Sequence, residues 1–247
     1  MKIKHLLCFI ALCLFFTPGK AQQLSVMTLR NGATVYIWED KSKPDVFGMI
    51  AFKVGSVDDP EQYTGLAHYL EHVMFKGTQT IDALDWEKEK PIYEKIIAKY
   101  DERAALSDPA AREAVDKEIN DLTREAAQYA AGNEFSLLVD HMGGQGLNAS
   151  TGYDQTEYHN SFPPSQLEKW LEIYSERLID PVFRGFQTEL EAVYEEYNMY
   201  NDDRGSRMRE FIYEQAFGDH PYARPIIGLP EHLKNPQLSK LIDFYNT

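Results

Sequence analysis

Cysteine is almost absent from this 247-residue chain, because its two cysteines, Cys8 and Cys13, both lie close to the N-terminus. The rest of the chain can form no disulfide, and any metal site there must use His, Asp or Glu side chains. Long apolar runs are also lacking. The run LLCFIALCLFF at residues 6–16 has only 11 residues, which is too few to span a bilayer.

This short apolar run has the surroundings of a secretory signal peptide. Basic residues, Lys2 and Lys4, precede it, and the sequence TPGKA with small residues follows it. We therefore predict a signal peptide at residues 1–21, cleaved after Ala21, and an exported chain that is periplasmic or secreted. A membrane anchor would need a longer run, and the bulky Leu12 disfavours a lipoprotein site at Cys13. No membrane span is expected after cleavage.

Basic side chains are scarce as well. Without the three lysines of residues 1–21, there are 22 Lys and Arg side chains against 39 Asp and Glu side chains, a net charge of −17. So acidic a chain is poorly suited to bind nucleic acid or an anionic membrane. With 43% hydrophobic residues it can nevertheless bury a proper core.

The patterns along residues 22–247 predict one domain of the α+β class, with helices packed on a mainly antiparallel sheet. Asn31-Gly32 between two β-rich runs predicts a hairpin, and VFGMIAFKVG predicts a buried strand. Residues 82–131 have helical periodicity on two faces, separated by the capping sequence SDP. We interpret them as an inserted helical hairpin.

The sequence HYLEH at residues 68–72 is the strongest candidate for chemistry. On a helix capped by Thr64, His68 and His72 would lie one turn apart on the same face, where both imidazoles can bind one zinc ion. Glu71 would flank that ion as a general base for the zinc-bound water. This is the inverted H-x-x-E-H order of the inverzincins. The alternative is a helix that contains two histidines without any metal role.

A catalytic zinc needs a third protein ligand, and the sequence ELEAVYEEYN offers two candidates. Glu189 and Glu196 are seven residues apart, which places them two turns apart on one helical face. Spacing alone leaves an ordinary solvated acidic helix equally open.

Four motifs in this order resemble the pitrilysin–insulinase family of zinc peptidases: HYLEHVMFKGT, LNASTGYDQTEYH, ELEAVYEE and HPYARPIIGLPEHL. The resemblance covers the chain from Leu24 onward, apart from the helical insert. It implies that His68, His72 and Glu196 bind zinc, that Glu71 is the catalytic base and that Glu189 is the supporting carboxylate. It also implies that Asn148, Ala149 and Ser150 form an edge strand that binds the peptide substrate by β-strand addition. Asn148 as a simple turn residue is the alternative.

The same resemblance implies a partner. Members of this family continue beyond the point that corresponds to Thr247 and contain a second homologous domain, so we expect a domain that is incomplete at its C-terminal end. The second domain would belong to the same longer chain or to a partner subunit. The resulting prediction is a zinc endopeptidase domain that acts on extended peptides. The alternative is a non-catalytic scaffold subunit of a two-chain peptidase, against which the intact HYLEH and EAVYEE motifs argue.

Overall fold

The computed structural model describes residues 24–247, so the predicted signal peptide lies outside the described residues. The described residues divide into two compact units, with the boundary between Pro44 and Asp45. In the first, β1 (Leu24–Thr28) and β2 (Thr34–Trp38) pair antiparallel around the predicted Asn31-Gly32 turn, where Gly32 has a φ of +87°. Such a φ favours glycine, which explains the turn.

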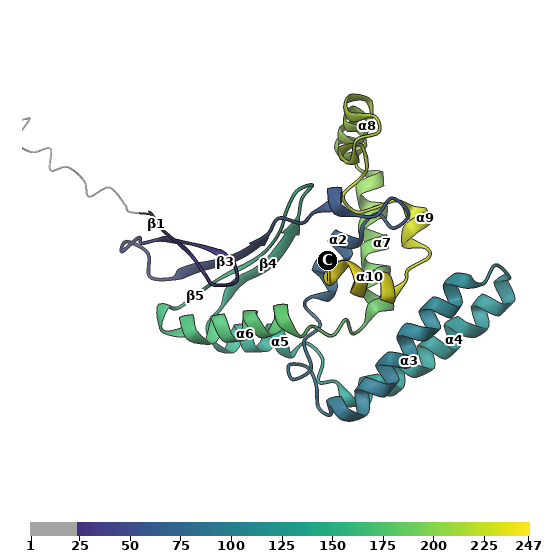
Figure 1. The fold of residues 1–247 in the computed structure, drawn as a ribbon, viewed down its shortest axis with the longest axis horizontal. Coiled ribbons are helices and arrows are strands. Elements are labelled where there is room, and N and C mark those ends of the chain that lie inside the picture. The colour runs from purple at the N-terminus through teal and green to yellow at the C-terminus, as the bar shows by residue number, and fades with distance from the viewer. Residues whose placement is uncertain (1–23) are drawn as a thin grey trace, which may run out of the picture. The chain divides into compact units, whose positions relative to one another are not determined.

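The second unit contains a three-stranded antiparallel sheet with the order β3-β5-β4 (Figure 1). Its strands are β3 (Val46–Phe52), β4 (Gln145–Thr151) and β5 (Thr156–Phe162). The prediction of a buried strand at β3 is wrong in one respect. β3 lies at an edge of this sheet and faces helices on one side only, so that Phe47 on its other face is 60% exposed.

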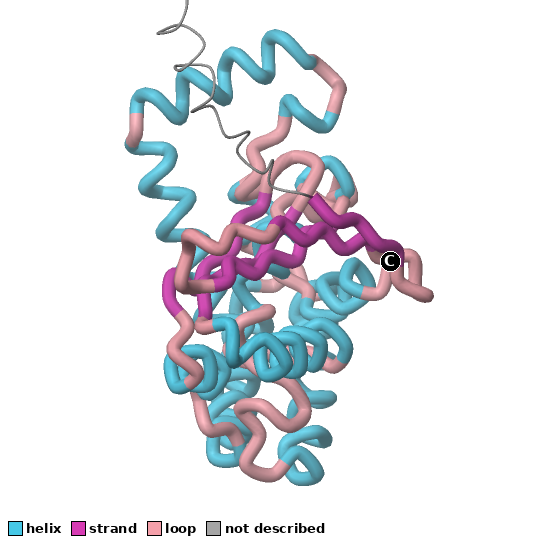
Figure 2. Tube along the Cα trace, turned by 90° about the vertical axis from the view of Figure 1, so that its left-hand side faces the viewer, coloured by secondary structure: helices cyan, strands magenta, loops and turns pink. Residues whose placement is uncertain are grey.

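Helices make up most of the regular structure of the described residues (Figure 2). Their bounds are α2 (Leu66–Val73), α3 (Trp86–Ala105), α4 (Pro109–Ala126), α5 (Glu134–His141), α6 (Leu167–Ile179), α7 (Phe186–Asp202), α8 (Arg204–Phe217), α9 (Pro230–Leu233) and α10 (Leu238–Tyr245). Short 3-10 turns, η1 to η4, cover Ser56–Asp58, Ala127–Tyr129, Pro164–Gln166 and Pro221–Ala223. The predicted α+β class is therefore confirmed.

The core lies between the sheet and α6. Phe162 on β5 stacks on Trp170 of α6, with ring centroids 5.1 Å apart, and Trp170 stacks in turn on Tyr174. The buried amide oxygen of Asn160 accepts hydrogen bonds from both α6 side chains, from Trp170 Nε1 and from the Tyr174 hydroxyl, each at 2.7 Å. Aromatic stacking and a satisfied polar group thus fix α6 against the sheet.

Two long antiparallel helices, α3 and α4, fill most of residues 82–131 (Figure 1). Asp108 caps α4 by accepting a hydrogen bond from Ala111 N, and Pro109 is its first helical residue, as the SDP sequence predicts. The pair is tied to the rest of the unit by the buried ion pair between Glu89 and Arg184. Its status as an insert remains a prediction.

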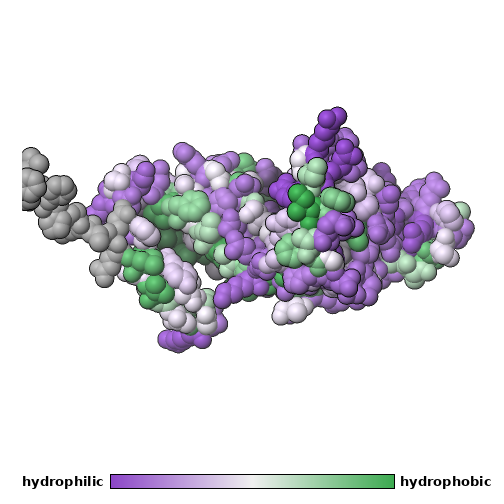
Figure 3. Space-filling model, turned by 90° about the horizontal axis from the view of Figure 1, so that it is seen from above, coloured by the Kyte–Doolittle hydropathy of each residue, from purple (hydrophilic) through white to green (hydrophobic). Residues whose placement is uncertain are grey.

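Most of the face drawn in Figure 3 is hydrophilic, with apolar side chains in separate patches. Within residues 24–247 no helix has both the length and the apolar character needed to cross a membrane.

Candidate metal centre

Two histidines project from one face of α2 because the opposite face is apolar and buried. Leu66, Tyr69 and Val73 are in the core, whereas the rings of His68 and His72 lie side by side with centroids 4.8 Å apart. The Tyr69 hydroxyl donates to the carbonyl oxygen of Phe186, the first residue of α7. This bond places α7 beside α2.

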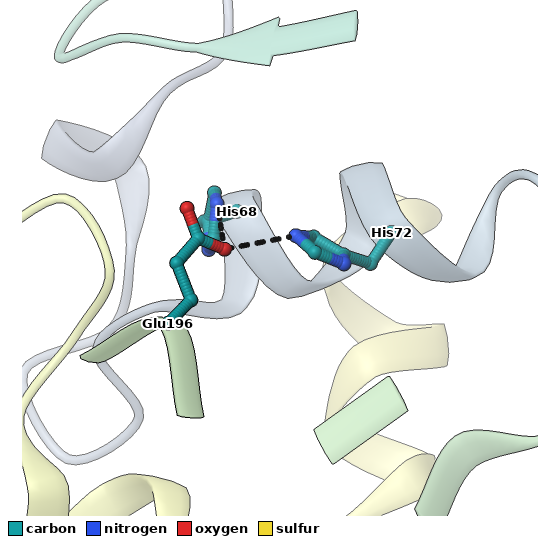
Figure 4. A group of neighbouring side chains, drawn as sticks. All are labelled: His68, His72 and Glu196. Atoms are coloured by element: carbon teal, nitrogen blue, oxygen red, sulfur yellow. Dashed lines mark ion pairs between the residues drawn. The ribbon is translucent and has the colours of Figure 1, made fainter. Parts of the chain in front are cut away.

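Glu196 on α7 completes a group of three candidate ligands. Its Oε2 lies 3.7 Å from His68 Nε2 and 3.5 Å from His72 Nε2, between the two imidazoles (Figure 4). All three donor atoms lie within 4.8 Å of one another, so the group can hold a metal ion. Two ligands of a tetrahedral zinc at the usual bond lengths lie about 3.3 Å apart. The arrangement therefore fits zinc with little movement.

Glu189 is not one of the three candidate ligands, but it contacts one of them, His72. Its Oε2 is 3.5 Å from His72 Nδ1, and its Oε1 is 2.5 Å from Lys76 Nζ. A carboxylate on the second nitrogen of a ligating histidine orients the ring and sets its tautomer. The structure thus separates the two glutamates that spacing leaves equivalent: Glu196 faces both imidazoles, and Glu189 supports one of them.

Burial and charge act differently on the two histidines. Burial lowers the pKa of His68 to about 4, helped by the neighbouring His72. Burial also opposes the charged form of His72, but the carboxylates of Glu189 and Glu196 outweigh it and raise its pKa to about 9. Near neutral pH, His72 is therefore protonated and His68, which lies beside the same Glu196 carboxylate, is neutral. A bound metal would have to displace that proton.

Glu71 is on α2 between the two histidines and is only 9% exposed. Its Oε2 accepts a hydrogen bond of 2.6 Å from Thr151 Oγ1, at the end of β4. Burial raises the pKa of Glu71, while the Thr151 hydroxyl opposes the rise. A carboxyl group with a raised pKa beside a metal site suits proton transfer near neutral pH.

The predicted substrate-binding residues lie on β4, which is at the other edge of the described sheet. Asn148 and Ser150 are exposed, and Ala149 between them is buried. Ser150 Oγ donates to Glu157 Oε1 on β5 at 3.1 Å. Because Thr151 of the same strand contacts Glu71, the structure brings this edge next to the candidate base.

The sequence patterns overlooked three residues of this site: Lys76, Thr151 and Tyr200. Lys76 is four residues beyond His72, and this spacing is a usable signal, although α2 ends at Val73. Tyr200 is likewise four residues beyond Glu196. Together with His68 and Thr151, Tyr200 lines a cavity of about 260 Å³ that adjoins the metal centre. Contacts across elements, such as Thr151 with Glu71, leave no trace in local spacing.

Comparison with known families and proteins gives several matches. The sequence model of the insulinase family, peptidase family M16, matches residues 34–90 and 119–229. The unmatched interval lies within the predicted insert. An uncharacterized zinc protease of Mycobacterium leprae is 25% identical over 78% of this chain and 32% of its own length. The zinc protease PqqE of Helicobacter pylori is 25% identical over 89% of this chain and 39% of its own length.

Solved structures show the same fold. A protease from Helicobacter pylori superposes with a TM-score of 0.66 at 22% identity, over 91% of this chain and 43% of its own length. Pitrilysin superposes with a TM-score of 0.63 at 22% identity, over 93% of this chain and 20% of its own length.

The chain spans about a third of the length of the first relatives that it matches. The family predicted from the four motifs is confirmed, because its model matches well over half of the residues. The chain belongs to the insulinase family of peptidases, family M16.

Proposed function

We propose that this chain is the metal-binding domain of a zinc endopeptidase. The observation that carries the proposal is the convergence of His68, His72 and Glu196 on one point, with Glu71 between that point and the edge strand β4. Two imidazole nitrogens and one carboxylate oxygen form a ligand set of catalytic zinc, which leaves a fourth position open. The relatives named zinc proteases support zinc as the metal.

Zinc bound there would acidify a water molecule and polarise the scissile carbonyl group. The chain's own groups divide the remaining work. Glu71 takes a proton from the water, while Thr151 holds its Oε2 in place. Glu71 then delivers that proton to the nitrogen of the leaving amine. Glu189 keeps His72 oriented throughout.

The substrate is proposed to be an extended peptide that adds to β4 along Asn148, Ala149 and Ser150. An edge strand presents unpaired backbone N–H and C=O groups. A peptide can bond to them through its own backbone, whatever its amino-acid sequence. Because Thr151 continues this strand to Glu71, a peptide laid along β4 would pass the metal centre. Gly152 N bonds to Gln155 O, so the alternation of an antiparallel pair directs the N–H of Ala149 away from β5, toward the free edge. Ala149→Pro would remove this N–H, and weaker peptide binding by this variant would support the strand assignment.

The test measures zinc content and peptide hydrolysis in wild type, His68→Ala and Glu71→Gln. We expect about one zinc per wild-type chain, loss of zinc in His68→Ala, and retained zinc without hydrolysis in Glu71→Gln. A wild-type chain that binds no zinc would overturn the proposal. Equal loss of zinc in both variants would show that the assigned roles are wrong.

The non-catalytic scaffold remains the second candidate, since the chain spans only part of the relatives that it matches. We propose that a second homologous domain, from the same longer chain or from a partner subunit, completes the catalytic chamber. Zinc binding without hydrolysis, even after such a domain is added, would favour the scaffold. Export to the periplasm or outside the cell is also a proposal, and the N-terminal sequence of the mature protein tests it directly.

A further inference from the structure

The helix that carries both histidines is too short to be stable alone. α2 has 8 residues, whereas isolated helices shorter than about 12–15 residues are marginal in water. His68 and His72 bind one ion only if the turn between them is formed. The arrangement of the metal centre therefore depends on what holds the two ends of α2.

A buried carboxylate holds the N-terminal end. Asp59 is 5% exposed, its Oδ2 accepts a hydrogen bond of 2.7 Å from Gly65 N, and its Oδ1 accepts one of 2.9 Å from Ala67 N. Gly65 is the N-cap residue and has no side chain with which to bond these groups. Asp59 thus supplies the cap from six residues upstream, and one of its bonds is to the residue directly before His68.

A buried guanidinium holds the C-terminal end. Arg177 of α6 is fully buried, and its Nε donates a hydrogen bond of 2.9 Å to the carbonyl oxygen of Met74, the C-cap residue of α2. Its Nη1 and Nη2 have no hydrogen-bond partner within residues 24–247. Four aromatic rings surround the guanidinium instead, with centroids 4.2 to 5.5 Å from it: Phe75, Tyr158, Phe135 and Tyr174.

The signs of the two charges match the ends that they contact. The N-terminus of a helix carries a partial positive charge and the C-terminus a partial negative one, so a carboxylate stabilises the first and a guanidinium the second. Both groups are buried at a cost, because burial raises the pKa of Asp59 to about 7 and lowers the pKa of Arg177 to about 10. Because their burial costs folding energy, we expect Asp59 and Arg177 to position α2 more than to stabilise the protein.

We propose that Asp59 and Arg177 are positioning residues that clamp the two ends of α2 and hold His68 and His72 in the metal-binding arrangement. This inference rests on the proposed zinc site. It predicts that the clamp is present before the metal binds, so that the metal meets a preformed pair of imidazoles. Neither residue contacts the metal ligands' donor atoms.

The chain offers a matched control for each clamp. Asp58 lies next to Asp59, but its Oδ2 accepts a hydrogen bond of 2.9 Å from Gly55 N, at the start of the η1 turn, and not from an amide of α2. Arg112 resembles Arg177 in that its Nε donates to a C-cap carbonyl, that of Leu106 at the end of α3, at 2.7 Å. Replacing Asp58 or Arg112 removes the same charge, and the same kind of hydrogen bond, as replacing Asp59 or Arg177, but leaves the bonds to α2 in place.

The experiment measures zinc affinity by competition with a chelator at pH 8, where Asp59 is ionised, in samples whose far-ultraviolet circular dichroism shows the wild-type fold. We expect Asp59→Asn and Arg177→Met to bind zinc about 10- to 100-fold more weakly, as loss of a group that orients metal ligands does. Asp58→Asn and Arg112→Met should stay within about twofold of wild type. The absorption spectrum of bound cobalt(II), which reports coordination geometry, should change only in the first pair.

Wild-type affinity in Asp59→Asn, or an equal loss in Asp58→Asn, would overturn the inference. Hydrogen exchange of the zinc-free wild type tests it without a variant that has to fold. The amides of Gly65 and Ala67 should exchange as slowly as that of Tyr69, which is bonded inside the helix to Gly65 O. Fast exchange at Gly65 and Ala67 would refute the clamp, whether or not the chain binds zinc. Absence of zinc binding, by itself, would refute only the proposed function.

Discussion

The replacement Glu189→Gln separates a supporting carboxylate from a zinc ligand. One Glu189 oxygen is 3.5 Å from His72 Nδ1 and the other is 2.5 Å from Lys76 Nζ, and both partners are hydrogen-bond donors. A glutamine amide would turn an NH₂ group toward one of the two donors, so one contact is lost. Loss of such a supporting partner costs about 10- to 100-fold in metal affinity. This corresponds to about 1.4 to 2.7 kcal/mol.

The assay is chelator competition at fixed pH, with Glu195→Gln as the control. Glu195 is on the same helix, next to Glu196, but its side chain is exposed, so this variant removes the same charge without touching His72. We expect Glu195→Gln to bind zinc as wild type does, and Glu196→Ala to lose tight binding altogether. Equal losses in Glu189→Gln and Glu195→Gln would refute the reasoning, because they would mean that net charge, and not the contact with His72, sets the affinity.

Three further predictions concern stability. Glu89→Gln should lower the free energy of unfolding in urea by about 3–5 kcal/mol, because it leaves the charge of Arg184 buried without its partner; a loss below 1 kcal/mol would show that water reaches this pair. Gly48→Ala should cost about 1–3 kcal/mol and lower the Tm, since a Cβ there would lie 2.6 Å from Trp170 Cζ2; an unchanged Tm would contradict the packing of α6 on the sheet. Asp59 keeps a proton in the folded chain up to about pH 7, whereas an unfolded Asp releases it near 3.8. The stability that this proton contributes is therefore lost as the pH rises from about 4 to about 7. In urea unfolding of zinc-free protein, the free energy of unfolding of wild type should fall over this range relative to that of Asp59→Asn. A difference that does not vary with pH would exclude the raised pKa.

The sequence by itself determined the features that depend on local spacing. The Asn31-Gly32 hairpin follows from a turn that needs a positive φ, and the two helices within residues 82–131 follow from apolar periodicity and capping residues. The pairing of His68 and His72 follows from the i, i+4 geometry of any helix. The family also followed from sequence, because four motifs in a fixed order are specific as a set.

Local spacing was less reliable at the start of the metal-binding helix. Thr64 was the predicted N-cap residue, but the cap is Gly65, and the Thr64 hydroxyl bonds instead with His232 Nδ1 at 2.8 Å. Asp59 binds Ala67 N, one of the amides that Thr64 would have capped. A preference for threonine at N-caps is an average over many helices, and a tertiary contact with a residue far along the chain outweighed it here.

Only the tertiary structure decided which glutamate faces the histidines and what surrounds them. Glu189 and Glu196 lie on the same helical face and are equivalent by spacing, but the packing of α7 against α2 places Glu196 between the imidazoles and Glu189 behind one of them. The bond from Thr151 to Glu71 joins residues 80 positions apart, and that from Arg177 to Met74 joins residues 103 positions apart. Helical periodicity fixes neighbours within a few residues, whereas contacts between elements depend on how the whole core packs. The candidate metal centre is therefore local in His68, Glu71 and His72, which share α2, and tertiary in Glu196 and in the contacts that support these side chains.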